Sequence, residues 1–392
     1  MRGACAALLV LVASAVPAAS GGDHVLLDVR ARYLPPLQRA FADTPDGWQA
    51  RYDAARDLQE AVRRVVRIVP GCLGLRGALL RYSAAHVAYA EAFDGLLRRR
   101  PPAIPAPPRA SCTTCPCKSV LPVLRRVELD LPSSWRRAAL PGSTDPRLAA
   151  GLERIGRGFR GWAGFWVHDL RTGRTAGWNA DARFPAASTV KLGAIVAALV
   201  RSAPDPWTSP YAADVRAIAS WSSNLAANRI AERLGTAAVA DGLRRLGMVS
   251  STYPGLYRAG TATATDAPKP PPLRTTRVTT ARDLGRALLR LHAAAAGRRW
   301  ALRATGLSRP QAAAGRAELL ASRPEGDNAG LLRPWFRGRP LAQKHGWLSD
   351  TRTTAAVVYR AAGPVIVVVE VHAQGLTLVE AQRLAGAVAM LL

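Results

Sequence analysis

Lysine is nearly absent from this sequence of 392 residues, although the chain is strongly basic. Of the 54 basic residues only four are lysines, and all the others are arginine. The four are Lys118, Lys191, Lys269 and Lys344. An arginine can replace a lysine wherever a surface cation is sufficient, but a guanidinium does not release its proton in a protein, whereas a buried ammonium can. A lysine that persists in such a chain is therefore a candidate for proton transfer.

Long apolar segments are also missing, which argues against a membrane-spanning helix. Such a helix needs roughly 18–20 consecutive apolar residues, and no run in the chain reaches that length. Residues 1–20 instead combine an early arginine, an apolar stretch over residues 6–16 and small residues at Ala18-Ala19-Ser20. This pattern predicts a secretory signal peptide. Cys5 lies too early to be a lipid-modified first residue, so we expect a secreted or extracytoplasmic protein without a lipid anchor.

Acidic residues are scarce, and the formal net charge is +27. The arginines are scattered along the chain and no nucleic-acid-binding module is recognisable, so we expect no nucleic-acid partner. We expect an exported protein with this positive charge to be attracted to anionic cell-wall polymers or lipid headgroups in a non-specific, salt-sensitive way.

Few cysteines remain once the signal peptide is removed, namely Cys72, Cys112, Cys115 and Cys117. An even number in an exported chain favours disulfides, and we expect Cys72 to pair with one member of the 112–117 cluster. A metal site is the rival interpretation, but no histidine or second Cys-x-x-Cys lies near enough to complete a zinc pattern. We expect neither a metal nor a cofactor.

The chain divides into an N-terminal helical domain at residues 21–100, a proline- and cysteine-rich linker at 101–144, and a larger domain at 145–392. In the first part, residues 48–68 and 73–97 carry apolar residues at helical spacing, and nothing in them suggests chemistry. Residues 101–108, which open the linker, are proline-rich and typical of a semi-rigid spacer.

The larger domain has the pattern of an α+β fold. Helices are predicted at residues 145–159, at 280–296 and at 376–392. A further helix is predicted to begin near residue 188, and a helical region follows it up to residue 246. Strands are predicted at 161–170, at 175–179, and as a pair within 355–371. This order implies one antiparallel sheet in which the two ends of the domain meet, flanked by helices and by an all-helical subdomain.

A serine precedes one of the rare lysines by three residues, in Ser188-Thr189-Val190-Lys191. An apolar, alanine-rich run follows and predicts a buried helix that begins near Ser188. Residues three apart in a helix share a face, so the two side chains can come within hydrogen-bond reach. Because burial disfavours a charged ammonium, Lys191 is a candidate base for the Ser188 nucleophile.

Two further motifs follow in the same domain. Ser222 and Asn224 stand two residues apart at the entry to a helix, where such residues are ordinarily caps. Lys344-His345-Gly346-Trp347 stands before a predicted strand, where a lysine and a glycine are ordinarily a solvated edge and a turn.

Taken in order, S-x-x-K, S-x-N and K-x-G resemble the motifs of penicillin-recognising serine hydrolases, and within them those of class A β-lactamases. The stretch from Ser222 to Asn228 is similar to that family's Ser-Asp-Asn-Thr-Ala-Ala-Asn, and Thr279-Thr280-Ala281 is similar to the Thr-Thr-Pro that opens a helix in many members. The resemblance covers roughly residues 145–392 and leaves the N-terminal part unexplained.

The resemblance implies a role for each motif residue. Ser188 would form an acyl-enzyme with Lys191 as its proton acceptor, and Ser222 and Lys344 would pass a proton to the departing nitrogen. The substrate would be bound by Asn224, His345, Gly346 and Trp347. The backbone N–H groups of Ser188 and Trp347 would form the oxyanion hole.

Three departures from the family's pattern affect the expected chemistry. No Glu-x-x-x-Asn loop follows the second motif, and Asp266 is the only carboxylate between residues 250 and 280. His345 replaces the usual threonine or serine. The interval from Ser188 to Ser222 is also short, which suggests a trimmed and more open cleft. We therefore expect acylation to be intact and deacylation to be slow.

Three functions fit these motifs. The first is a monomeric β-lactamase that cleaves the amide of a small-molecule β-lactam. The second is a penicillin-binding D-Ala-D-Ala peptidase or esterase that acts on cell-wall peptides. The third is a sensor that is acylated by penicillin without turnover.

Overall fold

The computed structural model describes residues 26–42, 44–65, 72–93, 103–108, 133–202, 205–257, 276–322 and 330–392. The predicted signal peptide and the Cys112, Cys115 and Cys117 cluster lie outside these ranges, as do Lys118, Lys269 and Asp266. None of the helices within the described ranges combines the length and apolar character that crossing a bilayer requires.

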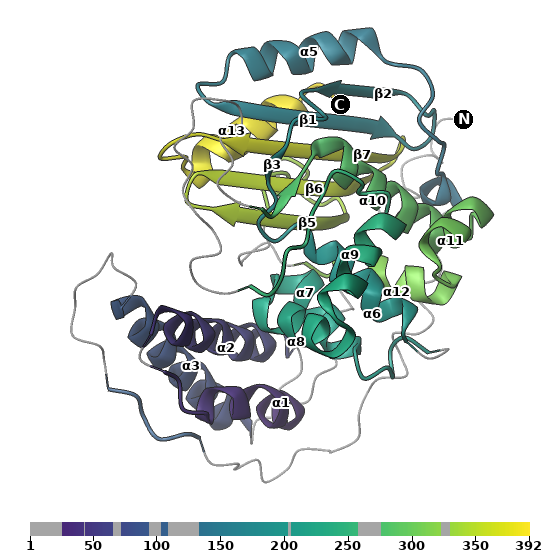
Figure 1. Cartoon of the computed structure of the whole chain (residues 1–392). Coiled ribbons are helices and arrows are strands. Elements are labelled where there is room, and N and C mark those ends of the chain that lie inside the picture. The colour runs from purple at the N-terminus through teal and green to yellow at the C-terminus, as the bar shows by residue number, and fades with distance from the viewer. Residues whose placement is uncertain are drawn as a thin grey trace, which may run out of the picture.

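An antiparallel sheet of five strands forms the centre of the larger part of the molecule (Figure 1). Its strands are β1 (Trp162–Asp169), β2 (Thr175–Trp178), β5 (Leu341–Leu348), β6 (Thr351–Arg360) and β7 (Gly363–His372). They lie in the order β2-β1-β7-β6-β5, so the first hairpin pairs with the last strand of the chain. This confirms the predicted α+β fold, in which an antiparallel sheet joins the two ends of the domain.

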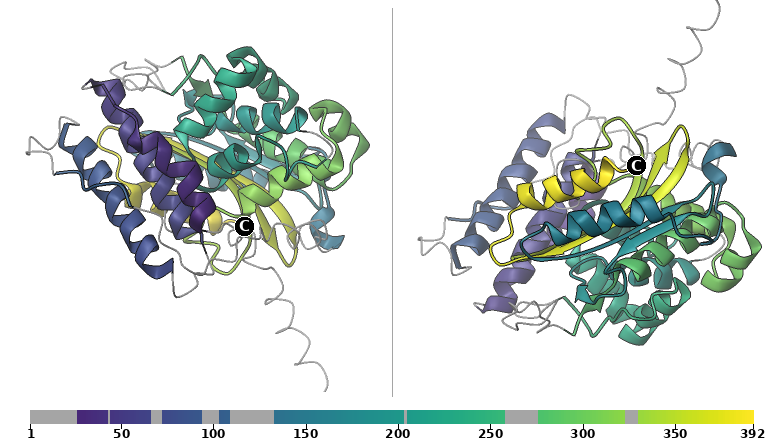
Figure 2. Two further views of the ribbon diagram at one scale, coloured as in Figure 1. Left: turned by 90° about the horizontal axis from the view of Figure 1, so that it is seen from below. Right: turned by 90° about the horizontal axis from the view of Figure 1, so that it is seen from above.

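Helices cover both faces of the sheet. The helices α5 (Pro146–Arg157) and α13 (Leu378–Ala389) lie side by side on one face (Figure 2). The helices α10 (Ala281–Ala295) and α12 (Arg309–Leu320) cover the other. In β7, Val367 and Val369 belong to the apolar cluster under α5 and α13, whereas Ile366 and Val368 belong to the cluster on the opposite face. This alternation follows from the two-residue period of a strand.

A second group of helices forms the predicted all-helical part, beside the β5 edge of the sheet. They are α6 (Lys191–Val200), α7 (Ala212–Trp221), α8 (Asn224–Leu234), α9 (Thr236–Arg245) and α11 (Arg299–Thr305). Two glycines let α6 and α9 approach closely, because a Cβ added at Gly193 would lie 2.6 Å from the Val239 carbonyl oxygen and one at Gly242 would lie 2.2 Å from the Gly193 carbonyl oxygen. The apolar α6 is buried, as its composition predicts.

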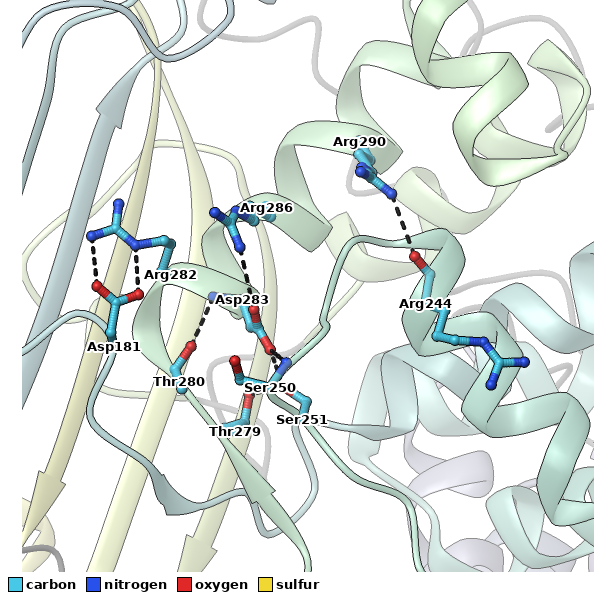
Figure 3. Close-up of polar contacts among 10 residues, drawn as sticks. All are labelled: Asp181, Arg244, Ser250, Ser251, Thr279, Thr280, Arg282, Asp283, Arg286 and Arg290. Atoms are coloured by element: carbon cyan, nitrogen blue, oxygen red, sulfur yellow. Dashed lines mark hydrogen bonds and ion pairs between the residues drawn. The ribbon is translucent and has the colours of Figure 1, made fainter.

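A network of side chains fixes the start of α10 (Figure 3). Thr280 caps the helix by accepting from the Asp283 amide at 3.1 Å. The Asp283 carboxylate in turn accepts from the Ser250 amide at 2.7 Å and the Ser251 hydroxyl at 2.8 Å. The Ser251 hydroxyl also lies 2.8 Å from the Thr279 hydroxyl, so the segment after α9 is tied both to α10 and to the short sheet formed by β3 (Phe184–Pro185) and β4 (Val278–Thr279). Thr280 immediately precedes a helix in the structure, as the resemblance implies.

Two sequence-based expectations about the motifs are wrong. The helix after the S-x-x-K serine begins at Lys191, so Ser188 lies in the turn before it and the helical spacing expected for Ser188 and Lys191 does not apply. The K-x-G motif lies inside the strand β5 and not at the start of the next strand. In β5 the polar residues Gln343, Lys344 and His345 are all buried, so the sequence lacks the apolar alternation by which a strand is recognised.

The N-terminal helices pack against the all-helical part. They are α1 (Leu26–Gln38), α2 (Pro45–Arg63) and α3 (Leu73–Phe93), and α2 contacts both α7 and α8 (Figures 1 and 2). Their buried side chains, among them Leu58 and Val62, belong to the same apolar cluster as those of α6 and α10.

Cys72 is buried and disulfide-bonded. Its pairing with the 112–117 cluster stays a prediction.

Candidate active site

The two rare lysines of the described ranges meet at one residue, Ser222. Lys191 lies at the start of α6 and donates to the Ser222 carbonyl oxygen at 2.5 Å. Lys344 lies in β5 and donates to the Ser222 hydroxyl at 2.7 Å. Both lysines are 0 % exposed. Two ammonium groups buried against one serine are costly to assemble, because each must replace its hydration with protein acceptors. Such an arrangement is typical of a functional site.

Ser222 owes its position to a strained backbone at the end of α7. It is the C-cap of that helix and has a φ of 66°, in the left-handed region that non-glycine residues rarely adopt. Ser223 then starts α8 by accepting from the Ala226 amide at 3.0 Å. The turn between the two helices thus presents the carbonyl and hydroxyl oxygens of Ser222 to the two lysines.

Ser188 lies in the turn before α6, against the backbone of β5. A Cβ added at Gly346 would lie 2.9 Å from the Ser188 nitrogen, 3.0 Å from the Ala186 oxygen and 3.1 Å from the Thr189 nitrogen. Only a glycine allows this approach. The residue before the serine, Ala187, has a φ of 46°, so a second strained non-glycine position borders the site. The half-buried Ser188 is therefore held next to the K-x-G strand.

Asn224 connects Lys191 to the N-terminal part of the chain. Its Oδ1 accepts from the Lys191 Nζ at 2.5 Å. Its Nδ2 donates to the Asp53 carboxylate of α2. The Nδ2 atom lies 3.2 Å from the Asp53 Oδ1 and 3.1 Å from the Asp53 Oδ2. The carboxamide thus binds a cation at one end and a carboxylate at the other.

A tyrosine covers another side of Lys191. The Lys191 Nζ lies 4.4 Å from the centre of the Tyr257 ring, and the Tyr257 hydroxyl donates to the Ala187 carbonyl at 3.0 Å. Asn228 holds the tyrosine in place, because its side chain accepts from the Tyr257 amide at 2.7 Å and donates to the Tyr257 carbonyl at 2.9 Å. The segment after α9, in which the resemblance would place a Glu-x-x-x-Asn loop, therefore presents an aromatic ring to Lys191.

His345 and Trp347 occupy different surroundings. His345 is 3 % exposed, and its Nδ1 lies 2.8 Å from the Thr354 hydroxyl. Burial, aided by the neighbouring Lys344 charge, lowers the pKa of His345 to about 3, so the imidazole is neutral near pH 7. Trp347 is 47 % exposed beside Arg352. Substrate contacts through these two residues, and the oxyanion hole at the Ser188 and Trp347 amides, stay predictions.

Two acidic residues near the site were missed by the sequence analysis. Asp53 and Asp57 of α2 are four residues apart, so they share one face of the helix. Asp57 accepts from the Trp221 indole at 3.0 Å and from the Ser223 hydroxyl at 2.7 Å. The paired acids in the predicted helix at residues 48–68 were a signal. The sequence does not reveal, however, that this helix packs on α7 and α8.

Burial strongly perturbs both carboxyl groups. It raises the pKa of Asp53 to about 7, and the Asn224 hydrogen bond and the Lys191 charge only partly oppose this rise. Burial also raises the pKa of Asp57, against the hydrogen bond from Trp221. Near neutral pH, both the protonated and the ionised form of Asp53 are therefore populated, and the group lies one carboxamide away from Lys191.

Comparisons with known proteins agree with this architecture. Residues 147–206 and 214–392 match the model of the beta-lactamase enzyme family. A beta-lactamase from Streptosporangium roseum is 20% identical, with a TM-score of 0.51, and the alignment covers 63% of this chain and 97% of that one.

Two further solved structures are similar over nearly their whole length. A beta-lactamase from Sphaerobacter thermophilus is 21% identical, with a TM-score of 0.45 and coverage of 62% of this chain and 94% of that one. A protein named PBP-A is 19% identical, with a TM-score of 0.49 and coverage of 64% and 98%. No match was found among the curated proteins. The family match spans more than half of the chain, and its residues carry the sheet and both buried lysines, so this chain belongs to the beta-lactamase enzyme family.

Proposed function

We propose that this protein is a serine hydrolase that opens the amide of a β-lactam through an acyl-enzyme on Ser188. The observation that carries the proposal is the convergence of Lys191 and Lys344 on Ser222, beside the turn that holds Ser188. In this proposal Lys191 accepts the proton of Ser188 as its oxygen attacks the carbonyl carbon. Ser222 then delivers a proton to the departing nitrogen, with Lys344 as its partner.

In this proposal the groups around Ser188 and Ser222 bind the substrate. The buried charge of Lys344 attracts the substrate carboxylate, and Asn224 bonds the side-chain amide of the substrate. The amides of Ser188 and Trp347 hold the oxyanion. Removing one such donor from a comparable acyl-transfer site costs on the order of 3 kcal/mol in the transition state.

Release of the acyl group is the slow step in this proposal. Within the described residues, the segment that ends at Tyr257 contacts Lys191 with a ring and supplies no carboxylate, and Asp266 is the only acid in the sequence of residues 250–280. This observation also favours the second candidate function, a penicillin-binding peptidase or esterase, or an acylated sensor, in which the covalent adduct persists. The pattern of residues 1–20 supports export of the protein to the compartment where such substrates occur.

Covalent labelling with a fluorescent penicillin tests the proposed nucleophile. The wild-type protein should acquire one label, and Ser188→Ala should acquire none while its thermal unfolding is unchanged, because only one hydroxyl is removed. Ser133→Ala, the same substitution at an exposed serine, is the matched control and should label like the wild type. Equal labelling of the Ser188→Ala protein would remove the acyl-enzyme from the account.

A further inference from the structure

The helix α2 is fixed to the candidate active site by several buried contacts. Asp57 binds Trp221 and Ser223, the residues on either side of Ser222. The Trp221 ring also meets Tyr33 of α1, with ring centroids 6.2 Å apart, and the Arg64 guanidinium lies 5.3 Å from the indole centre. Figure 1 shows α2 beside α7 and α8, both of which it contacts. The N-terminal segment therefore borders the S-x-N turn directly.

Within this contact, Asp53 is directed at the catalytic groups and not at the surface. It is 8 % exposed, and its carboxylate contacts Asn224, whose other end holds Lys191. Gln49 of the same helix donates to the Asp53 Oδ1 at 3.1 Å and orients it. In the proposed complex Asn224 bonds the substrate's side-chain amide, and this would bring the Asp53 carboxylate, which is bonded to the same carboxamide, close to the acyl group. The Asn224 amide nitrogen carries two hydrogens, so it can serve Asp53 and a substrate together.

We propose that Asp53 is the general base of deacylation, supplied to the active site by the N-terminal helix α2. This inference rests on the proposed acyl-enzyme. The Asp53 carboxylate takes one proton from a water molecule as the water oxygen bonds to the acyl carbon. The tetrahedral intermediate then collapses, the bond from that carbon to the Ser188 oxygen breaks, and the proton on Asp53 passes to this oxygen. The products are the free acid and the restored serine.

The surroundings of Asp53 suit this role, because a general base works best when its pKa lies near the pH at which it acts. Burial keeps its pKa near 7, as described above, so an appreciable fraction of the carboxyl is protonated at neutral pH and cannot act as a base. Only the ionised form removes a proton, and deacylation should therefore rise with pH through about 7 and then level off. Within the described residues, the other acid at this turn, Asp57, is engaged by Trp221 and Ser223.

The variant Asp53→Asn separates a base from a structural group. Its amide oxygen can still accept from Asn224, so packing and acylation should be preserved while the base is lost. The experiment labels the full-length mature protein with benzylpenicillin, removes the excess, and follows loss of the acyl mass by intact mass spectrometry at about pH 6 to 9. Asp46→Asn, the same change at an exposed position of the same helix, is the matched control. Thermal unfolding of each variant verifies its fold.

We expect Asp53→Asn to be acylated like the wild type and to lose its acyl group at least tenfold more slowly, since general bases typically contribute about a hundredfold or more. The rise of the deacylation rate with pH should also disappear, which a merely structural role would not cause. Deacylation at the wild-type rate would overturn the assignment, and so would a folded variant that no longer acylates. A wild-type protein that takes up no acyl group would instead refute the proposed function, and this inference with it.

Discussion

At the scale of single residues, the most informative feature is the position of two of the few lysines in this arginine-rich chain. Lys191 and Lys344 are both fully buried, both bind Ser222, and they approach it from a helix and a strand. Their proposed tasks differ, because Lys191 must accept a proton whereas Lys344 has to offer a positive charge and a donor. The scarcity of lysine identified both residues in the sequence. Their meeting at Ser222 is a product of the fold.

This division of tasks predicts unequal effects of arginine at the two positions. Lys191→Arg should be nearly as inactive as Lys191→Ala, with acylation reduced by about a hundredfold or more, because a guanidinium cannot accept the serine proton. Lys344→Arg should retain part of the activity, because attraction of a carboxylate needs only charge. The rate of penicillin labelling measures both, and the two variants control each other since both side chains are 0 % exposed. Equal losses in the two arginine variants would show that this division is wrong.

At the scale of elements, the α7–α8 turn depends on α2. Ser222 holds a left-handed conformation between Trp221 and Ser223, and Asp57 binds the side chains of both neighbours. Such a conformation costs on the order of 1–3 kcal/mol and persists only where the surroundings enforce it. The N-terminal helix therefore has a second task beside the one inferred for Asp53, namely to keep the turn that presents Ser222.

Removing this anchor should destabilise the protein measurably. Asp57→Ala leaves the Trp221 indole and the Ser223 hydroxyl without their acceptor, and each such loss costs about 1–3 kcal/mol. Because the variant also relieves the burial of a carboxyl group, we expect a net loss of about 2 kcal/mol in the free energy of unfolding, measured with urea. Asp57→Asn, which keeps one acceptor, should lose less, and Asp46→Ala at the exposed start of the same helix should change little. An Asp57→Ala protein as stable as the wild type would mean that α2 does not support the turn.

At the scale of the whole molecule, the sequence predicted the sheet better than the site. The hairpin of β1 and β2, the pair of β6 and β7 and the closing α13 were predicted close to their bounds, because their apolar residues follow strand and helix periods. The strand β5 was missed because it buries Gln343, Lys344 and His345, whose partners come from other elements. The packing of α2 on α7 and α8 was missed for the same reason, because local periodicity does not specify which elements come together.

The proposed mechanism requires a covalent intermediate on Ser188 that forms faster than it is released. Rapid mixing of the protein with a chromogenic cephalosporin, with intact mass measured in parallel, distinguishes this intermediate from direct hydrolysis. We predict a burst of about one product per protein, then slow steady turnover, with the mass raised by one acyl group that Ser188→Ala does not acquire. Each tenfold difference between the two phases corresponds to about 1.4 kcal/mol of additional barrier for release. Rapid turnover without a burst and without an acyl adduct would contradict the account.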